Sequence, residues 1–344
     1  MDVRDGAGLA APRAGLTIDD YVAGVRAHDR AILGRTITMI ESRSPRHRRL
    51  AQDILVRLLP YAGGAHRIGI TGVPGAGKST FIEGFGLELV KRGHRVAVLA
   101  VDPSSPVSGG SILGDKTRMT ELTQREEAFV RPSPSGGTLG GVARTTRQTI
   151  VACEAAGYDV ILIETVGTGQ SEVTVSEMTD FFLVLMLPGA GDELQGIKKG
   201  VLEIADMIVV NKADGDNEIR AKQAAIHYRN ALHIVAPRSE NWSPPVLMCS
   251  SLKGVGLDAV WDKLCEHKEK LSASGEFQAK RQKQRLKWMW QLVQDRLMTD
   301  LRSHPKVVEC IPQIERDLLA GRLTATLAAD EILNTFEGGS REPG

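Results

Sequence analysis

The sequence lacks the features that mark membrane, secreted and nucleic-acid-binding proteins. No apolar run approaches the ~20 residues that a bilayer-spanning helix needs. Residues 1–6 lack the apolar core of a signal peptide and carry acidic side chains, which transit peptides avoid. The 43 Lys and Arg residues are balanced by 42 Asp and Glu, so there is no basic excess for nucleic acid. We therefore expect a cytoplasmic protein that binds neither membranes nor nucleic acid.

Cysteine is also scarce, and its spacing excludes two further classes of site. The four cysteines lie far apart in the sequence, and none forms a Cys-x-x-Cys pair: Cys153, Cys249, Cys265 and Cys310. A disulfide framework or a structural zinc site needs a closer and more regular arrangement. We interpret all four as buried or incidental thiols.

What the sequence does contain is an alternation of short apolar runs and helical patterns. The runs are nearly continuous in apolar residues, which is typical of parallel strands covered on both faces. They occupy residues 66–71, 95–102, 160–164, 181–187, 207–211 and 245–250. Alternating β and α units predict an α/β fold with a mostly parallel central sheet flanked by helices.

Helical extensions are expected on both sides of this sheet. A helical pattern begins at Thr17 and includes Ile32 and Leu33, and a second helix is expected from about Pro45. Pro60 and the glycine pair that follows mark a boundary. We predict an N-terminal helical extension over residues 1–62, a nucleotide-binding domain over 63–272 and a C-terminal helical segment over 273–344.

The C-terminal segment carries one apolar stripe on a long helix. Its members recur at steps of three and four residues: Leu286, Trp290, Val293, Leu297 and Leu301. The basic residues at 280–287 are interpreted as a solvated face rather than a nucleic-acid site. Pro305 and Pro312 are expected to interrupt the segment before a final helix over 323–336. A stripe that contains Trp needs a cover, so we expect it to form a dimer contact.

A glycine-rich loop between a strand and a helix is the firmest motif. It has the pattern of a phosphate-binding loop, or P-loop, and its residues are the expected nucleotide ligands: Gly72, Val73, Pro74, Gly75, Ala76, Gly77, Lys78, Ser79 and the adjoining Thr80. Backbone N–H groups of such a loop meet phosphate oxygens at a helix N-terminus. Lys78 is expected to reach the β- and γ-phosphates, and the Ser79 hydroxyl to bind Mg²⁺. The fold is therefore predicted to be that of a P-loop NTPase.

A second motif, at residues 211–214, indicates which base is bound. Asn211, Lys212 and Asp214 follow an apolar strand in the order Asn-Lys-Ala-Asp. A carboxylate in the last position can accept both the N1–H and the exocyclic amine of guanine, which adenine cannot offer. Ser250, Ser251 and Leu252 follow a later strand and are expected to complete this site. The expected ligands are thus GTP and GDP.

The metal and γ-phosphate elements are expected between these two motifs. Glu164 ends a strand and opens Glu-Thr-Val-Gly, so its carboxylate can hold Mg²⁺ through water while the N–H of Gly167 senses the γ-phosphate. Asp102, at another strand end, is a third candidate metal ligand beside Ser79 and Glu164. Whether Asp115, Lys198 and Lys199 act at the nucleotide or on a partner stays open.

The sequence offers no evident catalytic base. Gln170 lies three residues after Gly167 rather than next to it, so its ability to orient water is doubtful. Our candidate catalytic residues are Lys78, Glu164, Gly167 and Gln170. We expect slow intrinsic hydrolysis whose rate is set partly by a partner.

Several longer stretches resemble the MeaB/ArgK family of P-loop GTPases. They are residues 72–80, 101–106, 164–172, 187–200 and 211–214, and the resemblance runs from about residue 20 into the helical tail. The resemblance implies a homodimeric GTPase chaperone. Such a chaperone gates the delivery of cofactor to adenosylcobalamin-dependent methylmalonyl-CoA mutase and protects that enzyme.

Two other functions remain as alternatives. Some members of the resembling family were described as transport-linked protein kinases, so a P-loop kinase or phosphotransferase is one. The sequence has no protein-kinase catalytic loop, and the guanine motif opposes an ATP-dependent kinase. Related dimeric ATPases carry an extra lysine early in the P-loop, where this chain has Val73. The other alternative is a binding module for a different metalloenzyme.

Overall fold

The computed structural model describes residues 16–42, 44–101, 119–132, 139–165, 171–189, 199–234 and 239–339. The chain divides into two compact units, Met1–Phe277 and Gln278–Gly344, and each is described by itself.

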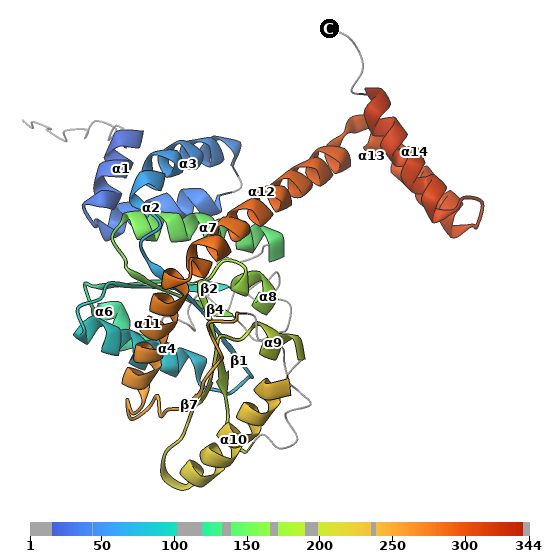
Figure 1. Cartoon of the computed structure of the whole chain (residues 1–344). Helices are drawn as coiled ribbons and strands as arrows, with labels where there is room; N and C mark the ends of the chain where they lie inside the picture. Colours follow the sequence, from blue (N-terminus) through green and yellow to red (C-terminus); the bar gives the residue numbers. More distant parts are fainter. Residues whose placement is uncertain are drawn as a thin grey trace, which may run out of the picture. The chain divides into compact units, whose positions relative to one another are not determined.

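The core of the first unit is a parallel sheet (Figure 1). Within the described residues it has seven strands in the order β3-β2-β4-β1-β5-β6-β7, and every neighbouring pair runs parallel. The strands are β1 His66–Gly72, β2 Val96–Val101, β3 Ala128–Arg131, β4 Val160–Thr165, β5 Phe181–Met186, β6 Met207–Val210 and β7 Val246–Met248. The predicted α/β fold with a parallel central sheet is confirmed. The edge strand β3 was not predicted, because its four residues are too few to show a pattern.

Side chains of each central strand alternate between two apolar layers. In β4, Ile161 and Ile163 pack into one cluster, whereas Val160 and Leu162 pack into the other. The first cluster contains residues of α7 (Leu139–Ala155), α8 (Ser171–Ser176), α9 (Lys199–Ile204) and α10 (Glu218–Ile234). The second contains residues of α4 (Lys78–Lys91), α6 (Thr120–Gln124) and α11 (Leu257–Ala273). Both faces are therefore covered, as the apolar strands require.

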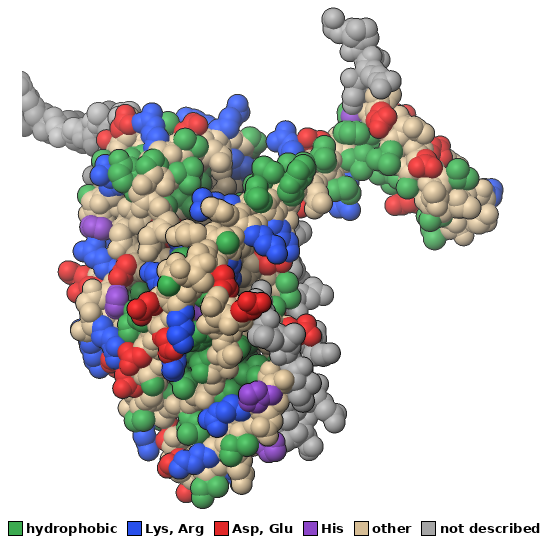
Figure 2. Space-filling model, viewed as in Figure 1, with side chains coloured by type: hydrophobic (Ala, Val, Ile, Leu, Met, Phe, Trp, Pro, Cys, Tyr) green, Lys and Arg blue, Asp and Glu red, His purple; other side chains and the backbone are tan. Residues whose placement is uncertain are grey.

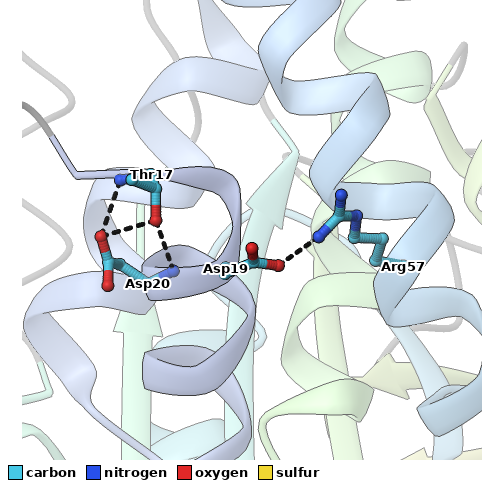
Figure 3. Close-up of polar contacts among 4 residues, drawn as sticks. All are labelled: Thr17, Asp19, Asp20 and Arg57. Carbon is cyan, nitrogen blue, oxygen red and sulfur yellow. Dashed lines mark hydrogen bonds and ion pairs between the residues drawn. The ribbon is translucent and has the colours of Figure 1, made fainter.

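In the described residues before β1, the structure has three helices and a short turn: α1 Ile18–Arg26, α2 Arg30–Glu41, α3 Pro45–Leu58 and the 3₁₀ turn η1 Leu59–Tyr61. Thr17 caps α1 in a reciprocal capping box with Asp20, and Asp19 pairs with Arg57 of α3 (Figure 3). The pattern that begins at Thr17 is broken between α1 and α2. The Asp29 carboxylate caps α2 by accepting from the N–H of Ala31 at 2.8 Å. This break was not predicted from the sequence.

A buried ion pair joins β1 to α7, and a histidine contact joins the segment between α1 and α2 to the residue after α7. The Arg67 guanidinium of β1 pairs with Glu154 of α7 at 2.8 Å, and Glu154 also accepts from the Gly63 N–H at 2.6 Å. The His28 ring contacts the carbonyl of Ala156. Glu154 is 5% exposed, so removing its partner would leave a buried charge unpaired.

The second unit consists of helices. α12 spans Glu276–Ser303 and so begins just inside the first unit; α13 (Pro305–Leu319) and α14 (Ala325–Gly339) pack on each other. The α13/α14 contact buries Val307, Ile314 and Ala328. The prediction that Pro312 interrupts this segment is wrong, because α13 continues through it. At Pro312, α13 lacks one backbone N–H donor, and the helix packs on α14. None of the helices in the described ranges is long and apolar enough to cross a membrane.

Candidate functional site

The loop between β1 and α4 brings the glycine-rich motif to the carboxyl end of the sheet. Gly77 adopts a left-handed backbone conformation, with φ at 82°, and a Cβ added there would lie 3.0 Å from the Asn211 amide nitrogen. A Cβ on Gly72 would lie 2.4 Å from the carbonyl oxygen of Leu185 in β5. Both positions therefore require glycine. Pro74 and Gly75 are exposed, whereas Ala76 is buried.

Lys78 and Ser79 begin α4 directly after this loop. The Lys78 ammonium donates to the carbonyl of Gly72 at 2.9 Å, so its side chain folds back across the loop. Burial lowers the pKa of Lys78, while the nearby carboxylates of Glu164 and Glu172 act in the opposite direction. Thr80 is the next residue and is exposed. The Lys78 ammonium and the N-terminus of α4 therefore both lie at the phosphate loop, where each would attract an anion.

Glu164 comes to the loop from the neighbouring strand. Its Oε1 lies 3.4 Å from the Oγ of Ser79, although 85 residues separate the two in the chain. This contact is longer than the usual hydroxyl–carboxylate hydrogen bond of about 2.7 Å. Two hard oxygen donors are thereby placed beside the phosphate loop, and such donors fit Mg²⁺.

Asn211 connects three segments at the other side of the loop. Its amide nitrogen donates to the carbonyl of Ala76 at 2.8 Å. Its amide oxygen accepts from the N–H and the hydroxyl of Ser251, at 3.1 and 2.7 Å. Asn211 is 1% exposed, so water does not compete for these hydrogen bonds. The side chain therefore links the phosphate loop firmly to the segment after β7.

Asp214 and Ser250 lie next to this connection. The Ser250 hydroxyl donates to the Asp214 carboxylate, and the N–H of Ala213 donates to the carbonyl of Cys249 at 2.9 Å. Lys212 is exposed and has a positive φ of 57°. Leu252, in the turn closed by the bridge between Ser250 and Val255, is 81% exposed. The segment 211–214 and the segment 250–252, predicted from separate motifs, therefore lie together.

Glu172 near the site was not predicted, whereas the burial of Cys249 agrees with the expectation of a buried or incidental thiol. Glu172, on α8, is 3% exposed and its charge acts on Lys78. It stands inside the stretch 164–172, but no motif in that stretch assigned it a role. The Cys249 thiol lies 3.4 Å from the Asn211 amide oxygen, and burial raises its pKa to about 12, so it is an inert packing group.

Several predicted residues lie outside the described ranges. They are Asp102, Asp115, Gly167, Gln170 and Lys198, together with the side chain of Lys199. The structure therefore brings together the phosphate loop, Glu164, Asn211, Asp214 and the segment after β7. The strands β1, β4, β6 and β7 all end at this edge, where ligands of parallel sheets gather.

Comparison with known proteins agrees with this arrangement. A family model described as "Methylmalonyl Co-A mutase-associated GTPase MeaB" matches residues 33–306. A "Putative GTPase" of Caulobacter vibrioides is 54% identical over 321 residues, covering 93% of this chain and 98% of the relative. "Methylmalonic aciduria type A homolog, mitochondrial" of Mus musculus is 48% identical over 330 residues, covering 93% and 80%.

A solved structure is also similar over most of the chain. "Crystal structure of LAO/AO transport system kinase" has a TM-score of 0.75 at 37% identity, covering 93% of this chain and 97% of that one. The fold, the guanine-nucleotide chemistry and the relatives agree. The chain belongs to the MeaB family of P-loop GTPases, which bind guanine nucleotides and hydrolyse GTP.

Proposed function

We propose that this GTPase is a chaperone for adenosylcobalamin-dependent methylmalonyl-CoA mutase. In this role it gates the delivery of cofactor to the mutase and protects the enzyme from inactivation. The observation that carries the proposal is the family match over residues 33–306, since that family is described as mutase-associated. In this proposal GTP hydrolysis determines how long the chaperone stays bound to the mutase, and it is not a step of metabolism.

The site residues receive the following roles in this proposal. The backbone of residues 72–80 holds the phosphates, and Lys78 neutralises charge on the β- and γ-phosphates. Ser79 and Glu164 hold Mg²⁺, a role supported by their placement beside the loop. Asp214 pairs with the guanine edge and is held in place by Ser250. Ser251 and Leu252 complete the base site, and Asn211 fixes its distance from the phosphate loop.

The partner assignment can be tested by capture with nucleotide-loaded protein. We expect the full chain to bind methylmalonyl-CoA mutase, and to bind it with different affinities when loaded with GDP and with a non-hydrolysable GTP analogue. We also expect the mutase to change the rate of GTP hydrolysis. Equal affinity for the mutase in both nucleotide states would contradict the regulatory role of GTP hydrolysis. Binding to a different metalloenzyme, with no binding to the mutase, would contradict the assignment of the partner.

The phosphotransferase alternative has one supporting observation, the similarity to a structure described as a transport system kinase. The described residues argue for GTP hydrolysis instead, because the base segment 211–214 carries the guanine-type Asp214. Labelled γ-phosphate separates the two: release as inorganic phosphate supports the GTPase chaperone, and transfer to a protein or small molecule supports the alternative.

We also propose that the chain forms a homodimer through α12. Leu286 and Trp290 on this helix are 61% and 60% exposed, and Val293 and Leu297 continue the same stripe. Figure 2 shows hydrophobic side chains gathered along α12, with Lys and Arg side chains beside them. A stripe of large apolar side chains that includes Trp is typical of a protein interface.

A single charge on this stripe tests the dimer. Leu297→Glu is expected to convert a dimer of twice the 37.2 kDa chain into a monomer, because an unpaired carboxylate would be buried in the interface. Sedimentation velocity measures the change. Thr299→Glu, which adds the same charge at an exposed position on the opposite face of α12, is expected to leave the dimer intact. A monomeric wild type, or dimeric Leu297→Glu, would contradict the assignment.

A further inference from the structure

A buried pair of threonine hydroxyls joins the strand that leads to the phosphate loop with the strand that carries Glu164. The Thr165 hydroxyl donates to the Oγ1 of Thr71 at 2.8 Å. Thr165 is 0% exposed and Thr71 is 2% exposed, so no solvent competes for this bond. Thr71 directly precedes Gly72, and Thr165 directly follows Glu164.

The threonine pair lies at the end of the backbone pairing between β1 and β4. The backbone pairing of β1 with β4 extends from His66 and Val160 to Ile70 and Glu164. Thr71 and Thr165 stand at the next step of the register, where the hydroxyl bond joins the two strands. The side-chain bond thus extends the connection between the strands up to the first residue of the phosphate loop.

The pair and the nucleotide-facing side chains lie on opposite faces of the sheet. Glu164 points to Ser79 at the start of α4, and because side chains alternate, Thr165 points to the other face. Gly69, two residues before Thr71, lies on the face covered by α8, since a Cβ added there would be 3.1 Å from a methyl of Val175. The two hydroxyls therefore lie on the face of the sheet opposite to Ser79 and α4, and they do not face the nucleotide.

We propose that Thr71 and Thr165 are positioning residues for GTP hydrolysis, because their hydroxyl bond holds the Glu164 carboxylate in register with Ser79. The inference rests on the proposed role of Ser79 and Glu164 in binding Mg²⁺. A displacement of about 1 Å in such a group can reduce a rate up to about a hundredfold. The nucleotide itself is held by the backbone of residues 72–80 and by Asp214, and neither threonine hydroxyl belongs to these groups.

Thr165→Val and Thr71→Val test the proposal, because valine keeps the shape of threonine and removes the hydroxyl. We expect each change to lower kcat for GTP about tenfold and to raise the Mg²⁺ concentration needed for half-maximal rate. The affinity for GDP without metal should stay within about twofold. The double variant should be no slower than either single variant, since both remove the same bond. Thr165→Ser, which keeps the hydroxyl, should restore the rate.

Two controls separate this role from general destabilisation and from failure of the metal assignment. Thr36→Val removes an equally buried hydroxyl, which donates within α2 to the carbonyl of Ile32 at 2.9 Å, and should leave kcat unchanged. Glu164→Gln should raise the Mg²⁺ requirement by itself; if it does not, the metal assignment fails. If Glu164→Gln has its effect but the valine variants keep wild-type kcat and Mg²⁺ dependence, the threonine inference is wrong. It is also wrong if Thr165→Ser is as slow as Thr165→Val. Alanine replaces valine in any variant that does not fold.

Discussion

Lys78→Ala is expected to weaken GTP and GDP binding by at least about a hundredfold, and to remove measurable hydrolysis. Lys78 supplies the cation at the start of α4, and charge-assisted hydrogen bonds to two phosphates are worth about 1.5–3 kcal/mol each. A hundredfold loss corresponds to about 2.7 kcal/mol. Isothermal titration with each nucleotide measures the affinity. The fold should persist, because the Lys78 ammonium donates to the loop carbonyl of Gly72 and not to the apolar layers that hold the sheet.

A second lysine of the same helix provides the control. Lys91 is the last residue of α4 and is exposed, so Lys91→Ala makes the same chemical change far from the loop. It should keep wild-type affinity and rate, and circular dichroism should give the same spectrum for both variants. Retention of GTP affinity by Lys78→Ala would mean that residues 72–80 are not the phosphate site.

Asp214→Asn is expected to change which base is bound. The carboxylate accepts two hydrogen bonds from guanine, whereas the asparagine amide offers one acceptor and one donor. Xanthine has a carbonyl where guanine has its exocyclic amine, so it matches the donor of asparagine. We expect the affinity for GTP to fall about 10²–10³-fold, because one hydrogen bond to guanine is lost and its donor is left unpaired. The variant should then bind XTP more tightly than GTP.

Competition between GTP and XTP for the same protein measures this exchange. Asp216→Asn is the matched control, because Asp216 lies two residues further along in the exposed turn η3 (Gly215–Asn217). That variant should keep the preference for GTP. An Asp214→Asn protein that still prefers GTP would show that this carboxylate does not read the base.

The sheet was predictable because its strands carry a dense apolar signal. Strands such as β4 and β5 are buried on both faces, so nearly every residue is apolar and the pattern is visible without knowledge of neighbours. The edge strand β3 gives only four residues, and its last residue, Arg131, pairs with Glu41 of α2. Glu41 lies 90 residues from Arg131 in the sequence, so no local sequence pattern could have predicted this ion pair.

Helix boundaries were less predictable than the sheet. The end of α1 depends on His28, whose positive φ of 63° is accompanied by a contact of its ring with the Ala156 carbonyl in a distant segment. We attribute the continuation of α13 through Pro312 to its packing against α14. In both places tertiary contacts outweigh the local signal.

Contiguous motifs predicted which residues to consider for the site, but the contacts between distant segments could not be predicted. Lys78 and Ser79 follow from the spacing of one loop, and Asp214 from one tetrapeptide. Their connection through Asn211 to Ala76 and Ser251 needed the three-dimensional structure, as did the pairing of Thr71 with Thr165. Sequence shows which groups are present, but hydrogen bonds between segments about 94 or 135 residues apart carry no local pattern.

The central claim is that one edge of the sheet both reads guanine and holds the phosphates. The ratio of GTP to ATP affinity, measured by competition on the wild-type chain with Mg²⁺, tests this most simply. We expect GTP to bind at least about a hundredfold more tightly, because only guanine offers both donors to Asp214. Equal affinity for ATP and GTP would contradict the claim.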